Sequence, residues 1–161
     1  MLLRPIAPAD LPELLTVNNA AVPNVNEVDA DRFAELVGMA ALATVATDGD
    51  GLLGFVLAMA QGTDYDSANY QWFSARYPRF LYVDRVIVAE PGRGAGTGTA
   101  LYKAVFEHAG PGVPVTCEVN VRPPNEGSMR FHLRHGFTEV GRQDTEGGAK
   151  TVALLAARRP G

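Results

Sequence analysis

A glycine-rich stretch near the middle of the chain constrains its fold and chemistry more than any other segment. The apolar run Val86–Val88 leads into a turn with glycines at positions 94, 96 and 98, and a helical pattern follows. Glycine reaches backbone conformations that other residues avoid, and the first turn of a helix leaves N–H groups without partners in the helix. Together with the helix dipole, these groups attract phosphate. The stretch therefore predicts either a phosphate-binding site or an ordinary strand-turn-helix connection.

The length and composition predict one domain over residues 1–161. A chain of 161 residues, of which 47% are hydrophobic, can bury a core without help from a metal or from disulfides. The single cysteine, Cys117, lies in an apolar run, so we expect a buried side chain and not a nucleophile. A chain that cannot form an internal disulfide suits the reducing cytoplasm.

The charge balance argues against two classes of partner. The formal net charge is −4 and the sequence pI is about 5.3, which gives no general attraction to nucleic acid. No apolar run approaches the roughly 20 residues that span a bilayer, and no signal-peptide pattern is seen. We therefore expect a cytoplasmic protein that binds neither nucleic acids nor membranes, with any phosphate held by local groups.

Apolar patterning and turn formers divide the chain into strands and helices. Strands are expected at residues 2–6, 41–46, 52–59, 81–88, 115–121, 137–141 and 151–155. Helices are expected from Pro8, over about 29–37, after Gly98, and from Asn125 to His135. Asp10 is expected to cap the first helix, and two turns close hairpins, at Asp48–Gly51 and at Asp144–Gly148.

Two further segments carry predictions about burial. Residues 61–80 form an irregular insertion rich in aromatic side chains, which either lines a substrate pocket or covers an edge of the core. The strand 81–88 is apolar on both faces, so Asp84 and Arg85 each need a partner if they are buried. In the next helix, a core-facing stripe is expected at Leu101, Ala104, Val105 and His108.

Two common phosphate-binding motifs do not fit the glycine-rich stretch. A P-loop requires Lys followed by Ser or Thr after its last glycine, and neither pair occurs here. A dinucleotide fold places G-x-G-x-x-G near its first strand, whereas this motif lies past mid-chain and reads Arg-Gly-Ala-Gly-Thr-Gly. The ligand class must therefore come from other parts of the chain.

Two motifs, in this order, resemble the GNAT family of N-acetyltransferases. Val86-x-Val88 followed by Arg93–Gly98 is similar to that family's acetyl-CoA motif. A second motif, Asn125-x-x-Ser128-x-x-Phe131-His132 ending in Gly136-Phe137, is similar to its later helix-to-strand segment. The resemblance implies an α/β (α+β) fold of one domain. Its central sheet is mixed and mostly antiparallel, with about six to seven strands flanked by about four helices.

The resemblance also implies how acetyl-CoA is bound. The CoA pyrophosphate is expected at the backbone of Arg93, Gly94, Ala95, Gly96, Thr97, Gly98 and Thr99. Main-chain groups of the strand Val86-Ile87-Val88 are expected to pair with the pantetheine amides. Asn125, Ser128 and His132 share one helix face, which we expect to face the cofactor. No metal is implied.

Three side chains are candidates for proton transfer. His132 stands where many members of the family carry a tyrosine that protonates the leaving thiolate, and imidazole can transfer protons near neutral pH. A role in packing alone is the alternative. Glu118 occupies a position where some members carry a general base, and Asp84 is its rival. Either carboxylate instead pairs with an arginine if it has only a structural role.

The predicted activity is direct acetyl transfer from acetyl-CoA to a primary amine, on a small molecule or a peptide. Cys117 lies on the strand face opposite Glu118, which argues against an acyl-cysteine route. The alternative is a non-catalytic acyl-CoA-binding module that acts as a sensor or through the aromatic insertion. A homodimer is also compatible with the sequence, with an exposed strand edge or this insertion as the contact between the two copies.

Overall fold

The most deeply buried strand is the second arm of the hairpin predicted around Asp48–Gly51. In the computed structural model, which describes residues 1–160, strand β3 spans Gly51–Ala60. Its residues from Leu53 to Met59 are all buried, although successive side chains of a strand point to opposite faces. A continuous apolar run of this kind forms where both faces of a sheet are covered.

Seven strands are described, and their order is β1-β2-β3-β4-β5-β7-β6. The pair β4 and β5 is parallel, whereas the pairs β1–β2, β2–β3, β5–β7 and β7–β6 are antiparallel. Besides β3, the strands are β1 Leu2–Pro5, β2 Leu42–Asp48, β4 Leu81–Val88, β5 Val115–Arg122, β6 Thr138–Thr145 and β7 Lys150–Ala157. The predicted mixed and mostly antiparallel sheet is confirmed.

Five α-helices are described where the sequence predicted about four. They are α1 Leu11–Ala20, α2 Ala30–Met39, α3 Ala68–Ser74, α4 Thr97–Ala109 and α5 Glu126–Arg134. The additional helix is α3, so the segment 61–80 is not irregular throughout. The helix has only 7 residues, so its pattern in the sequence is short. Ser67 caps it by accepting a hydrogen bond from the backbone N–H of Tyr70.

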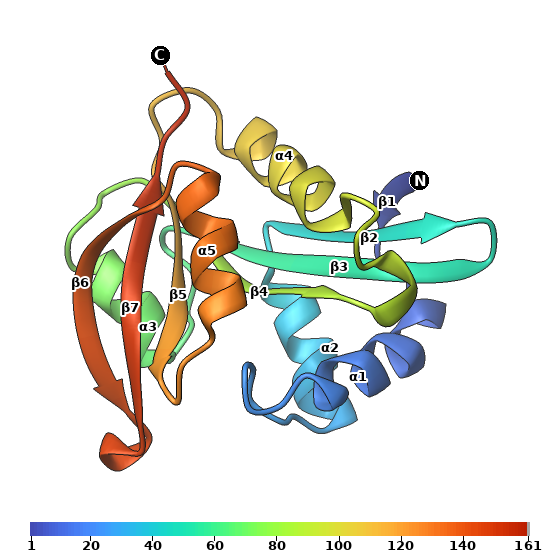
Figure 1. Cartoon of the computed structure of the whole chain (residues 1–161), viewed down its shortest axis with the longest axis horizontal. Helices are drawn as coiled ribbons and strands as arrows, with labels where there is room; N and C mark the ends of the chain where they lie inside the picture. Colours follow the sequence, from blue (N-terminus) through green and yellow to red (C-terminus); the bar gives the residue numbers. More distant parts are fainter. Residues whose placement is uncertain (161) are drawn as a thin grey trace. The chain divides into compact units, whose positions relative to one another are not determined.

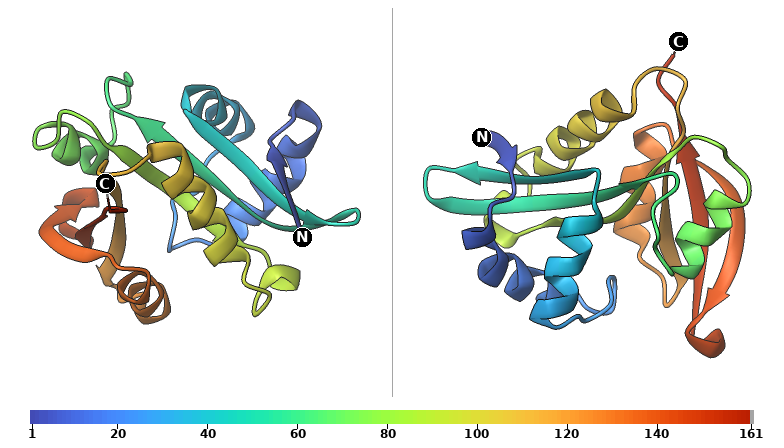
Figure 2. Two further views of the ribbon diagram at one scale, coloured as in Figure 1. Left: turned by 90° about the horizontal axis from the view of Figure 1, so that it is seen from above. Right: turned by 180° about the vertical axis from the view of Figure 1, so that it is seen from behind.

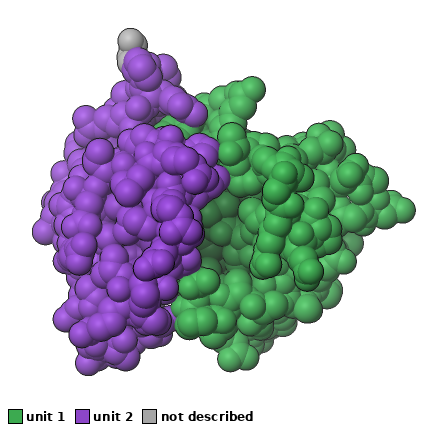
Figure 3. Space-filling view, viewed as in Figure 1, with its two compact units in different colours: residues 1–59, 83–108 green, residues 60–82, 109–161 purple. Residues whose placement is uncertain are grey.

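The chain divides into two compact units (Figure 3). Unit 1 consists of residues 1–59 and 83–108, and unit 2 of residues 60–82 and 109–161. In unit 1, helices α1 and α2 cover one face of the strands and α4 covers the other (Figures 1 and 2). This arrangement explains why β3 is apolar on both faces. Phe33 of α2 and Phe55 of β3 pack edge to face at 5.8 Å between ring centroids.

The predicted role of Asp10 as a side-chain cap of the first helix is wrong. Asp10 precedes α1 in the chain, but its side chain makes no capping hydrogen bond to that helix. Its carboxylate instead accepts two hydrogen bonds of 2.8 Å from Arg4 and one of 2.7 Å from the backbone N–H of Ala7. The Arg4 hydrogen bonds are the main reason that the pKa of Asp10 is lowered to about 2. The carboxylate thus ties β1 to the turn before α1.

The aromatic insertion forms part of the core of unit 2. Tyr70, Phe73 and Phe80 of the insertion are each no more than 1% exposed, and their rings contact one another and the buried Tyr82 of β4. Of the two interpretations of this segment, covering the core is therefore the one that describes these three side chains. In the same unit, α3 and α5 lie on opposite sides of strands β5 and β7 (Figures 1 and 2).

Two local predictions need correction. In α4, the buried stripe consists of Leu101, Tyr102, Val105 and Phe106, whereas His108 is exposed, because the stripe is rotated by one residue from the predicted one. In the last hairpin, pairing continues to Thr145 and Lys150, so only Glu146–Ala149 remain in the turn instead of Asp144–Gly148. Strand pairing extends beyond the apolar residues because backbone hydrogen bonds do not depend on side-chain polarity.

Among residues 1–160, no helix is long and apolar enough to cross a membrane.

Two buried threonines allow a matched test of this packing. Among the described residues, the Thr116 hydroxyl is buried without a hydrogen-bond partner, whereas the Thr97 hydroxyl donates to the Gly92 carbonyl at 2.9 Å. We expect Thr116→Val to raise the free energy of unfolding by about 1 kcal/mol, because valine removes an unsatisfied polar group at nearly the same volume. Thr97→Val is expected to lower it by about 1 kcal/mol. Urea unfolding measures both, and equal losses in the two variants would contradict the assignment.

Candidate active site

The glycine turn after β4 has an open backbone on its outer side. Gly94 and Gly96 have φ angles of 75° and 78°, and no atom lies within 4 Å of where a Cβ would stand at either position. These are left-handed conformations that glycine adopts at little cost. Gly98, the third glycine expected in the turn, instead lies inside the first turn of α4. The main chain at Gly94 and Gly96 is therefore accessible to a ligand.

The inner side of the turn is fixed to the rest of unit 1. Gly92 is buried, and a Cβ there would overlap the carbonyl of Leu53 on β3. The Thr97 side chain, 1% exposed, bonds to the Gly92 carbonyl and so joins the turn to the start of α4. Thr97 can therefore serve a ligand only through its main chain. The first N–H groups of a helix have no carbonyl in a preceding turn to bond to, and for this reason a helix start is suited to binding an anion.

Strand β4 offers the second feature that a CoA-like ligand requires. In the sheet, β4 lies between β3 and β5, and its register with β5 covers Leu81 and Tyr82, so Val86 and Val88 lie beyond this paired stretch. Val86 and Val88 are half-buried, and Ile87 points into the core. The edge of a strand can hydrogen-bond to an extended chain of amides, and pantetheine is such a chain. Val86 and Val88 therefore offer main-chain groups of the kind that pair with such amides.

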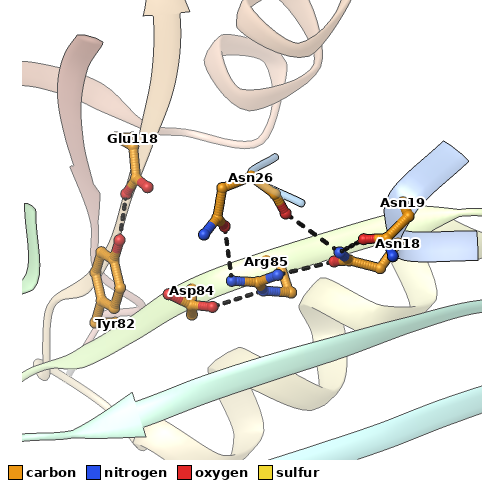
Figure 4. A network of polar contacts seen from close by, with 7 residues as sticks. All are labelled: Asn18, Asn19, Asn26, Tyr82, Asp84, Arg85 and Glu118. Atoms are coloured by element: carbon orange, nitrogen blue, oxygen red, sulfur yellow. Dashed lines mark hydrogen bonds and ion pairs between the residues drawn. The ribbon is translucent and has the colours of Figure 1, made fainter. Parts of the chain in front are cut away.

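Asp84 and Arg85 on the same strand partner each other, as their burial requires. Their side chains are 5% and 3% exposed, and Arg85 Nε donates to Asp84 Oδ2 at 2.7 Å (Figure 4). Arg85 also donates to the side-chain oxygens of Asn18 at 2.8 Å and Asn26 at 3.2 Å. Asp84 thus forms a buried ion pair, which is the structural alternative to its role as a base.

Glu118, the other candidate base, has a different environment. It lies on β5 and is half-buried, and its Oε2 accepts a hydrogen bond of 2.6 Å from the Tyr82 hydroxyl (Figure 4). Tyr82 itself is fully buried, so its ring is fixed by the aromatic core. The hydrogen bond from Tyr82 orients this carboxylate without neutralising its charge. Sequence reasoning missed this contact because the two residues are 36 positions apart.

Helix α5 brings Asn125, Ser128 and His132 into one chain of contacts. The Asn125 side chain accepts a hydrogen bond from the Ser128 N–H at 3.3 Å and caps the helix. Ser128 contacts the Nδ1 of His132 twice, through its carbonyl oxygen at 2.7 Å and its hydroxyl at 3.3 Å. The predicted spacing on one helix face is therefore confirmed. The contacts also give Asn125 and Ser128 structural roles within α5.

His132 is in a state that the sequence did not indicate. Its side chain is only 4% exposed, and burial lowers its pKa below the usual value, although the hydrogen bond to the Ser128 carbonyl acts in the opposite direction. Because Nδ1 lies 2.7 Å from a carbonyl oxygen, Nδ1 carries the proton of the neutral ring. Nε2 of this tautomer is a proton acceptor. His132 can therefore donate a proton from Nε2 only after it has first taken one up there.

No group of three His, Cys, Asp or Glu side chains suited to a metal ion is found within residues 1–160. Cys117 is buried and outside any disulfide, as predicted.

A comparison with known protein families adds the decisive observation. Residues 15–137 match the Acetyltransferase (GNAT) family, so the match includes strand β4, the glycine turn and helix α5. The chain belongs to the GNAT family. As a GNAT acetyltransferase, it uses acetyl-CoA to acetylate an amine. The resemblance drawn from the two sequence motifs is confirmed.

Solved structures agree on the GNAT fold. NAA60 of Arabidopsis thaliana, in complex with a bisubstrate analogue, has a TM-score of 0.76 at 22% identity, over 98% of this chain and 97% of that one. Ard1 of Thermoplasma volcanium has a TM-score of 0.77 at 15% identity, over 99% and 98% of the two chains. The ribosomal-protein-S18-alanine N-acetyltransferase of Escherichia coli has a TM-score of 0.73 at 14% identity, over 99% and 94%. A search of the curated proteins found no match.

The state of His132 can be measured in solution. We expect the neutral Nδ1–H tautomer at pH 7, with the imidazolium forming only below the ordinary histidine pKa of 6.5. Because the unfolded chain then binds this proton more readily, the contribution of His132 lowers the free energy of unfolding as pH falls below 6.5. A ¹⁵N-detected titration of the ring nitrogens, assigned with a His132→Gln variant, measures both. An imidazolium signal from His132 at pH 7 would overturn the assignment.

Proposed function

We propose that this GNAT enzyme acetylates the α-amino group of a peptide or protein. The observation that carries this is the open glycine turn at the end of strand β4, within a family match that spans residues 15–137. The peptide acceptor is supported by similar structures. One is named as an enzyme acting on the alanine of a ribosomal protein, and another, Arabidopsis thaliana Naa50, was crystallised with the bisubstrate analogue CoA-Ac-MVNAL.

Acetyl-CoA supplies an acetyl group that is activated as a thioester. In this proposal, backbone N–H groups of Gly94, Gly96 and the first turn of α4 bind its pyrophosphate, and main-chain groups of Val86 and Val88 bind its pantetheine amides. The N–H groups of Arg93 and Ala95 already donate to the Glu90 and Gly92 carbonyls. The N–H near Val88 polarises the thioester carbonyl. Asn125 and Ser128, proposed from the sequence to face the cofactor, act through the position that they give His132.

Glu118 is proposed as the general base that takes a proton from the acceptor ammonium, which frees the nitrogen lone pair for attack. Tyr82 holds one carboxylate oxygen by its hydrogen bond and so positions the base. Asp84 is the less suitable base, because its carboxylate already binds the buried guanidinium of Arg85. Nitrogen forms the new bond to the acetyl carbon as the carbon–sulfur bond breaks. The nitrogen then releases a second proton, which balances the proton that the thiolate takes up.

His132 is proposed to protonate the leaving thiolate, with one step added to the sequence-based prediction. Because its neutral tautomer is protonated at Nδ1, it must first accept a proton at Nε2 and then pass that proton to sulfur. The lowered pKa favours this transfer, since a buried imidazolium gives up its proton readily. The ring therefore acts as a proton relay in this proposal.

The setting of the reaction is part of the same proposal. The two units work as one acetyltransferase domain, a view supported by a family match that includes residues of both. A cytoplasmic location is supported by the single, buried Cys117. The net charge of −4 favours a small or peptide acceptor over nucleic acid. An edge strand such as β6 would serve for pairing in a homodimer.

A panel of acceptors tests the proposed substrate class. We expect thiol release from acetyl-CoA with heptapeptides that carry a free α-amino group and differ in their first residue, and a mass increase of one acetyl group on the peptide. The same peptides with a blocked N-terminus are matched controls and should not react. Turnover only with small-molecule amines would reject the peptide acceptor, and acetyl-CoA binding without any amine-dependent thiol release would reject the catalytic proposal.

Removing the proposed base gives a second test. We expect Glu118→Gln to lower kcat about 100-fold, a typical contribution of a general base, while the Kd of acetyl-CoA changes less than about twofold. Glutamine still accepts the Tyr82 hydrogen bond, so packing is retained. Glu107→Gln, on the exposed side of α4, is the matched control. Wild-type kcat in Glu118→Gln would remove Glu118 from the mechanism.

A further inference from the structure

Three exposed arginines of unit 2 take no part in the chemistry described above. Arg76 and Arg79 follow helix α3, and Arg158 follows strand β7. Within residues 1–160, none of these three side chains forms an ion pair. By contrast, three other cations of unit 2 each pair with a carboxylate: Arg122, Arg142 and Lys150. We call Arg76, Arg79 and Arg158 the arginine surface.

The segments that carry the arginine surface contain no acidic residue. Neither residues 67–80 nor residues 151–160 include an Asp or a Glu. The Arg158 guanidinium lies over the Tyr77 ring, 5.9 Å from its centroid, so the two segments meet in the fold. A hydrogen bond of 3.0 Å from the Gly112 N–H to the Arg159 carbonyl holds the chain next to Arg158. The positive charge is therefore not balanced within either segment.

Aromatic rings order two of the three guanidinium groups. Arg76 lies over the Trp72 ring, 3.6 Å from its centroid, and donates to the Trp72 carbonyl at 3.0 Å. Tyr77, which lies under Arg158, stacks on the buried Phe73 with 6.3 Å between centroids and 13° between planes. A guanidinium that lies over a ring keeps its N–H donors in its own plane, where they can bind an anion. Arg76 and Arg158 are therefore ordered donors.

Helix α3 gives the arginine surface a fixed support on strand β6. A Cβ at Gly141 would overlap the Trp72 ring, so the indole rests directly on the backbone of β6. Gln143, two residues further along this strand, donates to the Asn69 side chain at 3.0 Å. Residues three apart share a helix face and residues two apart share a strand face, so the two contacts fit together. The position of Trp72, and with it that of Arg76, is set by packing.

Charge is distributed unevenly over the chain. Unit 1 has five Lys or Arg and eleven Asp or Glu, whereas unit 2 has nine and seven. An anionic partner is therefore attracted by unit 2 and repelled by unit 1. Since the Debye length at physiological salt is about 8 Å, a short anionic segment responds mainly to the arginines that it contacts. A long polyanion also meets the acidic remainder of the protein.

The aromatic rings also distinguish between two kinds of anion. Proteins that bind single-stranded nucleic acid gain much of their affinity from bases that stack on exposed rings. Here the Trp72 ring is covered by Arg76 and rests on Gly141, and the Tyr77 ring lies between Phe73 and Arg158. These rings thus position guanidinium groups instead of receiving bases, which favours carboxylates as the partner groups.

We propose that the arginine surface docks a short acidic segment of a partner protein, whose Asp or Glu carboxylates bind the guanidinium groups of Arg76, Arg79 and Arg158. A carboxylate accepts two parallel hydrogen bonds from one guanidinium, which adds direction to the attraction of charges. None of the three arginines is assigned a role in acetyl-CoA binding or proton transfer, so this surface adds a function to the proposed one.

An octaglutamate peptide tests the surface, because Trp72 is the only tryptophan of the chain and lies under Arg76. We expect the peptide to bind saturably and to change the fluorescence emission of Trp72, whereas octaglutamine should do neither. Raising the salt concentration from about 50 to about 300 mM should weaken binding several-fold, because exposed ion pairs are screened. Saturating acetyl-CoA should leave the Kd of the peptide unchanged, which separates this surface from the glycine turn.

Arginine variants locate the site, with the Kd measured by the fluorescence anisotropy of labelled octaglutamate. We expect Arg76→Gln and Arg158→Gln each to raise this Kd about threefold, the scale of one exposed ion pair, and the double variant to raise it about tenfold. Arg122→Gln is the matched control, because Arg122 is an exposed arginine of the same unit that already pairs with Asp144. It should bind the peptide like the wild type. An unchanged Kd of acetyl-CoA shows that each variant is folded.

Several outcomes reject the proposal. Absence of octaglutamate binding at low salt does so, as does an equal loss of binding in Arg122→Gln or displacement of the peptide by acetyl-CoA. An oligouridylate that binds more tightly than octaglutamate assigns the surface to nucleic acid instead. A dimer that dissociates only in the double variant, measured by sedimentation, assigns it to a second copy of the chain and equally removes the acidic partner segment.

Discussion

The structure depends on how the backbone of strand β4 is satisfied. Every buried N–H and C=O needs a hydrogen-bond partner, and β4 lies in a region where both faces of the sheet are covered. β3 lies along one edge of β4, and on the other edge the register with β5 covers Leu81 and Tyr82 and leaves out Val86 and Val88. This edge gives the proposed pantetheine site its donors and acceptors. The ligand-binding capacity of the chain therefore follows from the same strand that organises its core.

Much of this fold follows from local patterns in the sequence. The Asp-Gly turn between β2 and β3, the two-sided strand β4 and the helix beginning after Asn125 all use signals within a few residues. Helix α3 was missed because 7 residues are too few for a clear period. The rotated stripe of α4 shows the same limit, since Tyr102 and Leu101 both fit a helical repeat and only packing decides between them.

The candidate site was predictable to a different degree in each of its parts. The glycine turn and the α5 motif are continuous in sequence, so their residues could be named directly. The Tyr82–Glu118 contact and the Arg85 network join residues 36 and 67 positions apart, and no pattern of a single chain encodes such pairs. For Asp84 and Arg85, the sequence indicated that partners were needed, but burial alone cannot identify the asparagines. The tautomer of His132 likewise depends on one carbonyl oxygen, that of Ser128.

The contact between Gly92 and the Leu53 carbonyl has a consequence for affinity. Because the turn rests directly on β3, its conformational entropy is lost when the protein folds and not when a ligand arrives. A ligand therefore meets main-chain donors that are already ordered. The strength of the proposed anion binding at this turn is then linked to the integrity of the β2–β3 hairpin, which lies much earlier in the chain and need not touch the anion.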